Sequence, residues 1–251
     1  MAAETKNQYM KPKRRSSISA PLMFVVIIFS AIFVMSVSFR VSNIQVNGNE
    51  HYTDEEIINA IDIEQGDNLF FFDRFAAVSR VFAKLPYVEE VSITRNLPNV
   101  VIIDVSESKA IAYIKMGSEL WTMDHKCKLL GKATEDEESE LINIIGFDPG
   151  TFYIGETLTQ SNGETDAVEY LIELLTEFQD RGITSKVSEI DMTDINNVFF
   201  RYDDRYKVII GNSDITERKI SLALSAISQL KSGDIGIITV LDGTACTFSP
   251  Y

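Results

Sequence analysis

An uncharged stretch near the N-terminus limits how much of this chain can fold in water. Residues 22–39 read LMFVVIIFSAIFVMSVSF, 18 residues without a charged side chain. As an α-helix this stretch would extend roughly 27 Å at about 1.5 Å per residue, close to the hydrocarbon thickness of a bilayer. We therefore predict a single transmembrane helix over 21–39 and a separate folded body after it.

The residues around this stretch indicate its orientation. The cluster KPKRR, residues 11–15, precedes it directly. By the positive-inside rule this cluster places residues 1–20 in the cytoplasm and the body outside the cell membrane. A cleaved signal peptide is the alternative, because small residues such as Ser36 and Ser38 end the run. The run exceeds the ~7 to 15 residues of a signal core, which favours a single-pass anchor.

Charge and residue counts exclude several kinds of ligand. The net charge is -14. Residues 1–20 carry +4, so the remainder carries -18, which argues against nucleic acid as a partner. Cys127 and Cys246 allow one disulfide, although two free thiols fit their distant positions better. His51 and His125 lack metal-ligand spacing, and we predict no metal and no cofactor.

The first part of the body predicts a strand, two helices and a hairpin. A strand over 41–46 ends at Asn47-Gly48, and Thr53 is a suitable N-cap for the first helix. The second helix covers 73–85 and stops before Pro86. Its predicted inward face comprises Phe75, Val78, Phe82 and Leu85, with Val81 beside them. The aromatic run 69–72 predicts core filling beneath the helices, with a membrane-dipping loop as the alternative.

The hairpin over 87–107 constrains its own loop. Val91 and Ile93 share one face of the first strand, and Val101, Ile103 and Val105 share one face of the second. Opposed residues must point the same way, so the numbers of each pair must sum to an even value. A two-residue turn at Leu97-Pro98 gives an odd sum. We therefore predict a three- or five-residue loop, with Pro98 outside the ladder and with Val100 and Ile102 facing away from the helices.

The order strand, helix, helix, strand, strand resembles a POTRA domain. The segments FRVSNIQVNGN and VEEVSITRNLPNVVIIDVSES are similar to those of the FtsQ/DivIB family of bacterial cell-division proteins. The hairpin pattern is carried by Ile93, Arg95, Pro98 and Glu107. The chain restarts with apolar residues at Ala110, which predicts a POTRA-like unit over 40–108 and an external β domain over 109–251.

The second unit reads as strands with two helices. Short strand-like segments cover 110–115, 119–124 and 127–132, and a helix covers 165–181. Further strands begin near residues 187, 197 and 205, and a last strand covers 235–241. Asp214 and Glu217 predict a capping box for the second helix. The fold class is therefore α+β: one transmembrane helix, a β-α-α-β-β domain and a mixed β-rich domain with at least two helices.

Motifs for catalysis are missing from the sequence. It contains no Gly-rich phosphate loop and no GxSxG elbow, so we predict a protein that is not an enzyme and takes no small-molecule substrate. The pairs Asp191 with Asp194 and Asp203 with Asp204 fit turns, where carboxylates cap backbone amides. Trp121 is predicted to lie in the core, and the acidic run 135–140 to form a solvated loop.

The resemblance implies a function. It implies a non-enzymatic component of the division machinery (divisome) at the septum, with partners of the DivIC/FtsB and FtsL types, which are single-pass proteins. It places the partner contact at the C-terminal edge of the β domain, where a free strand edge could accept a partner strand. Two further functions stay open: a POTRA-bearing secretion or assembly adaptor, and an anchored hydrolase. The implied site residues are Ile237, Ile238, Thr239, Val240, Leu241, Gly243 and Phe248.

Within that site the predicted last strand has two sides. Ile237, Thr239 and Leu241 lie on one, and Ile238 and Val240 lie on the other. Phe248 either contacts the partner or tucks into the domain.

Overall fold

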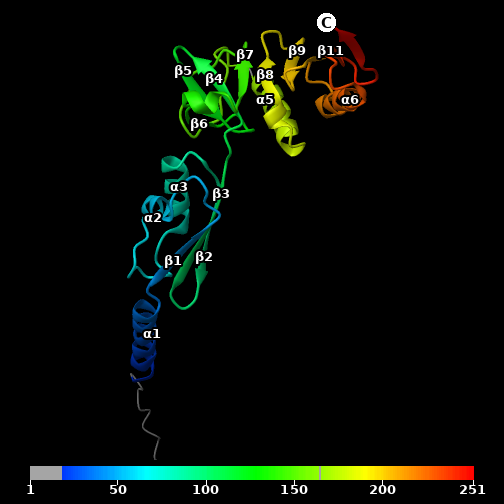
Figure 1. Cartoon of the computed structure of the whole chain (residues 1–251). Coiled ribbons are helices and arrows are strands. Elements are labelled where there is room, and N and C mark those ends of the chain that lie inside the picture. The colour runs from blue at the N-terminus through cyan, green and yellow to red at the C-terminus, as the bar shows by residue number, and fades with distance from the viewer. Residues whose placement is uncertain (1–18, 164) are drawn as a thin grey trace, which may run out of the picture.

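The structure is a computed structural model that describes residues 19–163 and 165–251. The basic cluster 11–15 lies outside the described residues. Figure 1 shows an elongated arrangement with α1 (Ser19–Ser38) at one end, a three-stranded unit beyond it and a nine-stranded sheet at the far end. Among the described residues, α1 is the one helix long and apolar enough to cross a membrane, and its span Pro21–Ser38 is exposed along its length. This helix fits a membrane anchor.

The unit that follows α1 has the predicted order of elements. Its members are β1 (Asn43–Asn47), α2 (Asp54–Ile61), α3 (Arg74–Lys84), β2 (Val88–Asn96) and β3 (Val100–Glu107). The strands are arranged β1-β3-β2, with β1 parallel and β2 antiparallel to the central β3. Thr53 caps α2 in a full capping box with Glu56, as its position predicts.

The β2–β3 hairpin confirms the parity argument. Val91 pairs with Val105 and Asn96 pairs with Val100, so residues 97–99 form a three-residue loop that contains Pro98. Val101 and Ile103 are fully buried in the core beneath the helices. Val100 and Ile102 are only partly buried and lie outside that core, as predicted.

The predicted inward face of α3 is confirmed for Val78, Val81 and Leu85, which belong to or pack against the core, and is wrong for Phe75 and Phe82. Its buried residues are Ala77 and Val81, followed by Leu85 at the C-cap. Phe75 is 77% exposed and Phe82 is 44% exposed. At 3.6 residues per turn, Ala77 points about 200° away from Phe75, so the aromatic stripe and the packed stripe are different faces. The small Ala77 side chain lets the helix lie close to its neighbours.

The aromatic run 69–72 divides between two environments. Leu69 is fully buried and Phe72 packs against the same core, as predicted. Phe70 is 38% exposed and Phe71 is 71% exposed, so core filling does not account for them.

The second sheet gathers the rest of the chain. Its strands follow the order β12-β11-β10-β9-β8-β7-β4-β5-β6. The first five in the chain's own order are β4 (Ala112–Met116), β5 (Glu119–Met123), β6 (Leu129–Lys132), β7 (Ile142–Ile145) and β8 (Val187–Asp191). The others are β9 (Val198–Tyr202), β10 (Tyr206–Gly211), β11 (Gly236–Thr239) and β12 (Thr247–Pro250). The predicted antiparallel run β4-β5-β6 is present, whereas β7, parallel to both β4 and β8, is not among the predicted strands.

Two helices pack against this sheet on the same side (Figure 1). They are α5 (Asp166–Asp180) and α6 (Thr216–Gln229). The rings of Phe178 on α5 and Phe200 on β9 meet edge to face with centroids 4.9 Å apart. Trp121 is 8% exposed and belongs to this core, in agreement with its predicted role. The mixture of helices with large sheets is an α+β fold.

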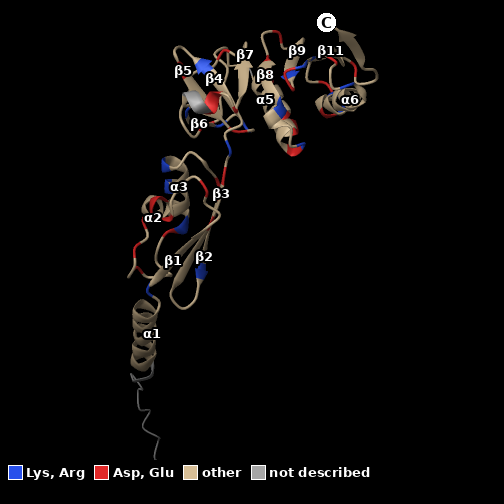
Figure 2. Cartoon of the chain, viewed as in Figure 1, with Lys and Arg blue, Asp and Glu red and all other residues tan. Residues whose placement is uncertain are grey.

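Of two local predictions for this unit, the capping box of the second helix is wrong, and the solvated acidic loop is correct only in its exposure, since residues 137–140 are exposed. α6 starts at Thr216 after Ile215, whose φ is +52°, and Asp214 accepts a hydrogen bond from Asn212 rather than capping the helix. The acidic run includes a short helix, α4 (Glu135–Glu138), which Thr134 and Glu137 start with a capping box. Figure 2 shows acidic and basic residues interspersed over both sheet units, while α1 carries neither.

Candidate functional site

The C-terminal edge of the large sheet differs from its prediction. β11 has no free edge, because it pairs with β10 in parallel and with β12 in antiparallel orientation. The free edge therefore belongs to β12. The sequence TFSP is a weak strand signal, since it has one strongly apolar residue and ends in proline. Proline is tolerated in edge strands, so it is compatible with the position of β12.

Burial divides the predicted site residues into two groups. Ile238 and Val240 are fully buried in the core, so their side chains are out of reach of a partner. Ile237 and Thr239 are partly exposed on the opposite face, and Leu241 is 55% exposed. The predicted alternation is correct, and it leaves only the second group for contact with a partner.

Phe248 lies on the edge strand opposite Ile238. Its ring packs partly against the core and meets the ring of Tyr206 edge to face at 6.4 Å between centroids. Its side chain therefore tucks into the domain to a large degree. What remains available at this position is mainly backbone.

The hydrogen bonds decide which backbone groups of β12 face outward. The amides of Gly236 and Val240 donate to carbonyls on the β10 side, so the even-numbered amides of β11 point away from β12. The Tyr251 amide donates to the Ile235 carbonyl at 3.1 Å. The odd-numbered residues therefore make the hydrogen bonds between β11 and β12. By the alternation of an antiparallel ladder, Phe248 directs both its N–H and its C=O outward. Pro250 offers only a carbonyl there.

The loop between β11 and β12 has a fixed shape. The Asp242 carboxylate accepts hydrogen bonds from the amides of Thr244 and Ala245, at 2.9 and 3.4 Å. The Thr244 amide is the main cause that lowers the pKa of Asp242. Gly243 has a φ of +63°, and an added Cβ would lie 2.3 Å from Cδ1 of Ile215. The predicted small residue is thus favoured by the backbone conformation, and an added Cβ would in addition have to displace the terminal methyl of Ile215.

Buried polar groups hold the start of α6 beside this loop. Nζ of Lys219, which is fully buried, donates to the backbone carbonyl and the side-chain oxygen of Asn212, each at 2.9 Å. Burial lowers the pKa of Lys219, while the carboxylates of Asp214, Glu173 and Asp242 oppose that shift. The hydroxyl of Tyr170 lies 2.9 Å from the Asn212 carbonyl oxygen. Sequence reasoning missed Tyr170, whose only signal was a hydroxyl on an otherwise apolar helix face.

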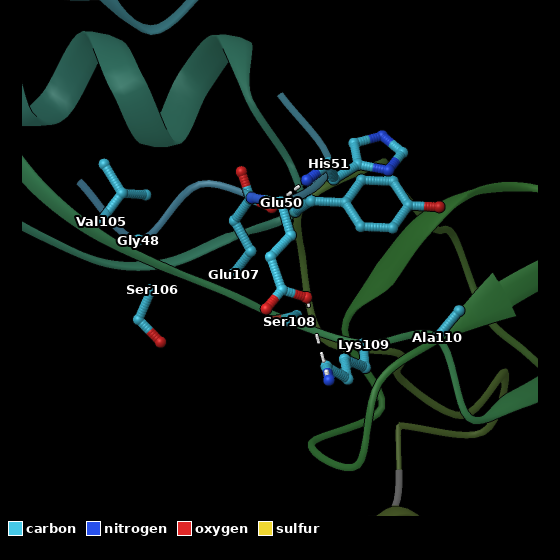
Figure 3. A pocket seen from close by; sticks show the side chains of 10 residues that line it. Gly48, Glu50, His51, Val105, Ser106, Glu107, Ser108, Lys109 and Ala110 are labelled. Atoms are coloured by element: carbon cyan, nitrogen blue, oxygen red, sulfur yellow. Dashed lines mark hydrogen bonds and ion pairs between the residues drawn. The ribbon is translucent and has the colours of Figure 1, made fainter. Parts of the chain in front are cut away.

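A second candidate region lies where the two units join. A hollow of ≈ 460 Å³ lies there, and Glu50, His51, Glu107 and Lys109 are among its lining residues. Figure 3 shows these side chains. The Glu107 carboxylate accepts hydrogen bonds from the backbone amides of Glu50, His51 and Tyr52. The His51 ring stacks on the Tyr87 ring with centroids 3.8 Å apart. These contacts tie the β1–α2 loop to the end of β3 and leave the carboxylate occupied.

Ionic contacts also cross from one unit to the other. Nζ of Lys126 lies 2.5 Å from the Glu89 carboxylate, and Nζ of Lys128 donates to the Val88 carbonyl at 3.0 Å. The hydrogen bond from Lys126 is the main cause that lowers the pKa of Glu89. We call these contacts the junction clamp. They limit how the POTRA-like unit and the large sheet can turn relative to each other.

The other carboxylates and thiols singled out in the sequence have structural roles or are buried. Asp191 and Asp194 accept hydrogen bonds from the amides of Thr193 and Asn196, each at 2.9 Å, as their turn contexts predict. Cys127 and Cys246 are free thiols, which excludes the disulfide alternative here, and burial raises the pKa of both. Among the described residues, no group of His, Cys, Asp or Glu is arranged to hold a metal ion.

Comparison with known proteins adds independent findings. Residues 39–108 match the family model "POTRA domain, FtsQ-type". The cell division protein DivIB of Clostridium botulinum is 27% identical over 92% of this chain and 89% of its own length. DivIB of Bacillus subtilis is 25% identical over 93% of this chain and 83% of its own length. A solved extracytoplasmic domain of DivIB from Geobacillus stearothermophilus covers 50% of this chain and 99% of its own, at 15% identity and a TM-score of 0.32, a likeness too weak to argue from.

The matching domain coincides with the three-stranded unit, and the relatives extend over both sheets. The chain therefore contains an FtsQ-type POTRA domain and is similar over about nine-tenths of its length (92% and 93%) to bacterial cell-division proteins named DivIB.

Proposed function

We propose that this chain is a non-enzymatic divisome component that binds and stabilises DivIC/FtsB-like and FtsL-like partners at the septum. In this proposal residues 21–39 anchor it in the cell membrane, residues 1–20 lie in the cytoplasm, and the POTRA-like unit 40–108 and β domain 109–251 lie outside. The names of its relatives, cell division proteins DivIB and FtsQ, support the process. The apolar helix α1 supports the anchor.

The observation that carries the partner site is the free edge of β12. Its outward groups are the N–H and C=O of Phe248 and the carbonyl of Pro250, which can pair with an added strand. Because Pro250 has no amide proton, an incoming strand finds only part of a ladder at that end. A short partner strand therefore fits this edge better than a long one, and the same proline discourages pairing with another copy.

Side chains beside the edge supply a surface for specificity. Ile237, Thr239 and Leu241 share the face of the sheet that α5 and α6 leave uncovered. Gly243 keeps the neighbouring loop close to Ile215. Buried Ile238 and Val240 contribute by holding β11 in place. The site we propose is thus the β12 backbone together with one exposed side of β11 and its loop.

Three variants test the backbone part of this site. Phe248→Pro removes the outward N–H and the aromatic ring, whereas Phe248→Ala removes the ring alone. Their difference isolates one hydrogen bond donor. A net hydrogen bond contributes about 1 kcal/mol, so Phe248→Pro should bind the external segment of a DivIC-like partner about fivefold or more weakly than Phe248→Ala. Ser249→Pro removes an inward amide of the β11–β12 ladder and is expected to disrupt the fold instead.

The measurement is the dissociation constant of the purified full-length chain in detergent, with amide hydrogen exchange of β11 as the folding check. Equal affinities for Phe248→Pro and Phe248→Ala, with β11 still protected, would reject strand addition at this edge. Septal accumulation of a fluorescent fusion tests the wider function, and uniform membrane labelling throughout division would count against it.

A further inference from the structure

A patch of exposed apolar side chains lies at the end of the POTRA-like unit where α1 enters it. Phe71 is 71% exposed, Phe75 is 77% exposed, Leu97 is 57% exposed and Phe70 is 38% exposed. We call these four residues the entry patch. They come from the loop before α3, the start of α3 and the tip of the β2–β3 hairpin. None of them is explained by the core or by the partner site.

Hydrogen bonds fix the first part of the patch to the end of α1. Nδ2 of Asn68 donates to the carbonyls of Met35 and Ser36, each at 3.2 Å. The Leu69 amide donates to the Phe39 carbonyl at 2.8 Å, and the rings of Phe39 and Phe70 meet edge to face at 5.1 Å between centroids. The loop that carries Phe70 and Phe71 therefore lies level with the last turn of the membrane-spanning helix.

The hairpin tip is tied to the same end of the unit. The Ser42 amide, four residues after α1, donates to the Asn99 carbonyl at 2.9 Å. Arg95 donates to the Phe72 carbonyl at 3.3 Å, and its guanidinium lies 4.7 Å from the centroid of the Phe72 ring. Figure 1 shows the hairpin loop beside the end of α1. Leu97 and the aromatic residues thus reach the level of the helix exit from two different elements.

The chemistry of this end suits a lipid headgroup region. Transfer of an exposed aromatic ring out of water is favourable, roughly in proportion to the apolar area that it buries. The Arg74 guanidinium is 5.6 Å from the centroid of the Phe75 ring. Arg40 pairs with Asn68 and Arg95 lies over Phe72, both next to the patch in the chain. Arginine can keep its charged group among phosphates while its stem lies along apolar surface. The neighbouring Asp73 carboxylate is engaged at the N-terminus of α3, where it accepts from two amides.

We propose that the entry patch inserts into the headgroup region of the leaflet from which α1 emerges, and so fixes the orientation of the POTRA-like unit on the bilayer. The occupant follows from continuity: the span ends at Ser38, and the contacts of Asn68 and Phe39 leave no spacer between the helix and the patch. A bilayer around α1 therefore meets these side chains without any further partner.

Fluorescence quenching by brominated lipids tests this insertion in the full chain. The single tryptophan is replaced first, as Trp121→Phe, which also removes a buried indole N–H without a hydrogen-bond partner. Tryptophan is then placed one position at a time by Phe71→Trp, Phe75→Trp and Leu97→Trp. Each protein is reconstituted into phosphatidylcholine and phosphatidylglycerol bilayers whose acyl chains carry bromine near the headgroup.

Two further positions serve as controls. Phe33→Trp lies within α1 and reports that the anchor spans the bilayer. Phe82→Trp is exposed on the same helix as Phe75 but roughly 10 Å further along its axis, at about 1.5 Å per residue. We expect the three patch indoles to be quenched and to lie about 5 to 10 Å into the headgroup and acyl boundary. The indole at position 82 should stay unquenched.

Three results would overturn the proposal. The first is no quenching at positions 71, 75 and 97 while position 33 is quenched. The second is equal quenching at positions 75 and 82, which would mean that the whole unit lies on the membrane without a defined patch. The third is shielding of the patch only after a partner protein is added, which would identify a protein as the occupant. Since Leu97 lies on a separate element, a folding defect at either phenylalanine leaves the test intact.

Discussion

Replacing Glu107 by glutamine should release the loop that it holds. The carboxylate accepts from the amides of Glu50 and Tyr52 at 2.9 and 3.2 Å and from the amide of His51. A carboxamide has one acceptor oxygen and turns an NH₂ group toward the remaining amide. Glu107→Gln therefore loses at least one bond and the negative charge that strengthens the others.

The magnitude follows from the number and kind of these bonds. Hydrogen bonds to a charged acceptor contribute about 1.5–3 kcal/mol and neutral ones about 0.5–1.5 kcal/mol. Two weakened bonds and one lost bond, reduced because the hollow opens to water, give a cost of about 2 kcal/mol. If the loop opens as a local unit, amide exchange at residues 50–52 should accelerate about 30-fold, since 1.4 kcal/mol corresponds to a factor of ten.

Hydrogen exchange measured by mass spectrometry on the peptide that contains residues 50–52 checks this value. Glu50→Gln is the matched control, because its side chain is 78% exposed and its ion pair with Lys109 is long, at 3.9 Å. We expect that control to change stability by less than about 0.5 kcal/mol. Unchanged exchange in Glu107→Gln, or an equal change in Glu50→Gln, would refute the assigned role.

Three further outcomes are expected. Ala77→Leu should destabilise the POTRA-like unit by about 1–3 kcal/mol through overpacking, whereas Phe82→Ser on the exposed face should change stability by under about 0.5 kcal/mol in denaturant unfolding. Tyr170→Phe should cost about 1–2 kcal/mol in the same assay, because it removes the hydroxyl donor to the Gly211 carbonyl, whereas the Asn212 carbonyl keeps its bond from Lys219. The pKa of Glu89 is lowered in the folded state, so its share of stability is present above its ordinary value near 4.5 and is lost as pH falls through the folded value. Lys126→Met should therefore reduce the acid sensitivity of exchange across the junction clamp; an identical pH profile would contradict it.

Local patterns predicted the parts of the fold that depend on neighbours in sequence. The paired faces of Val91 and Val105 required an odd loop, and the structure has three residues there. Thr53 likewise predicted the start of α2, where it forms a capping box with Glu56. In each case the determining residues lie a few positions apart, or in two strands joined by one turn.

Parts that depend on distant packing could not be predicted so well. Phe75 and Phe82 have helical spacing, yet the spacing alone does not say whether their face or that of Ala77 meets the sheet. β10 and β11 pair in parallel although a helix separates them in the chain. β12 pairs with the edge of β11 that was predicted to be free. Most of the implied site residues therefore lie on or just after β11, next to the proposed edge. The edge itself is formed by the backbone of β12, whose residues have weak strand signals.

The direction of β3 sets a height above the membrane. Its first residue pairs with Asn43, close to the exit of α1, and its last residue reaches the junction with the large sheet. Eight residues at about 3.3 Å each raise the base of that sheet roughly 26 Å. A helical partner that leaves the same bilayer must extend about 17 residues beyond it, at about 1.5 Å each, to reach the base of the large sheet. Under the proposed function, the POTRA-like unit would be a spacer that selects which stretch of a membrane-anchored partner can meet the β12 edge.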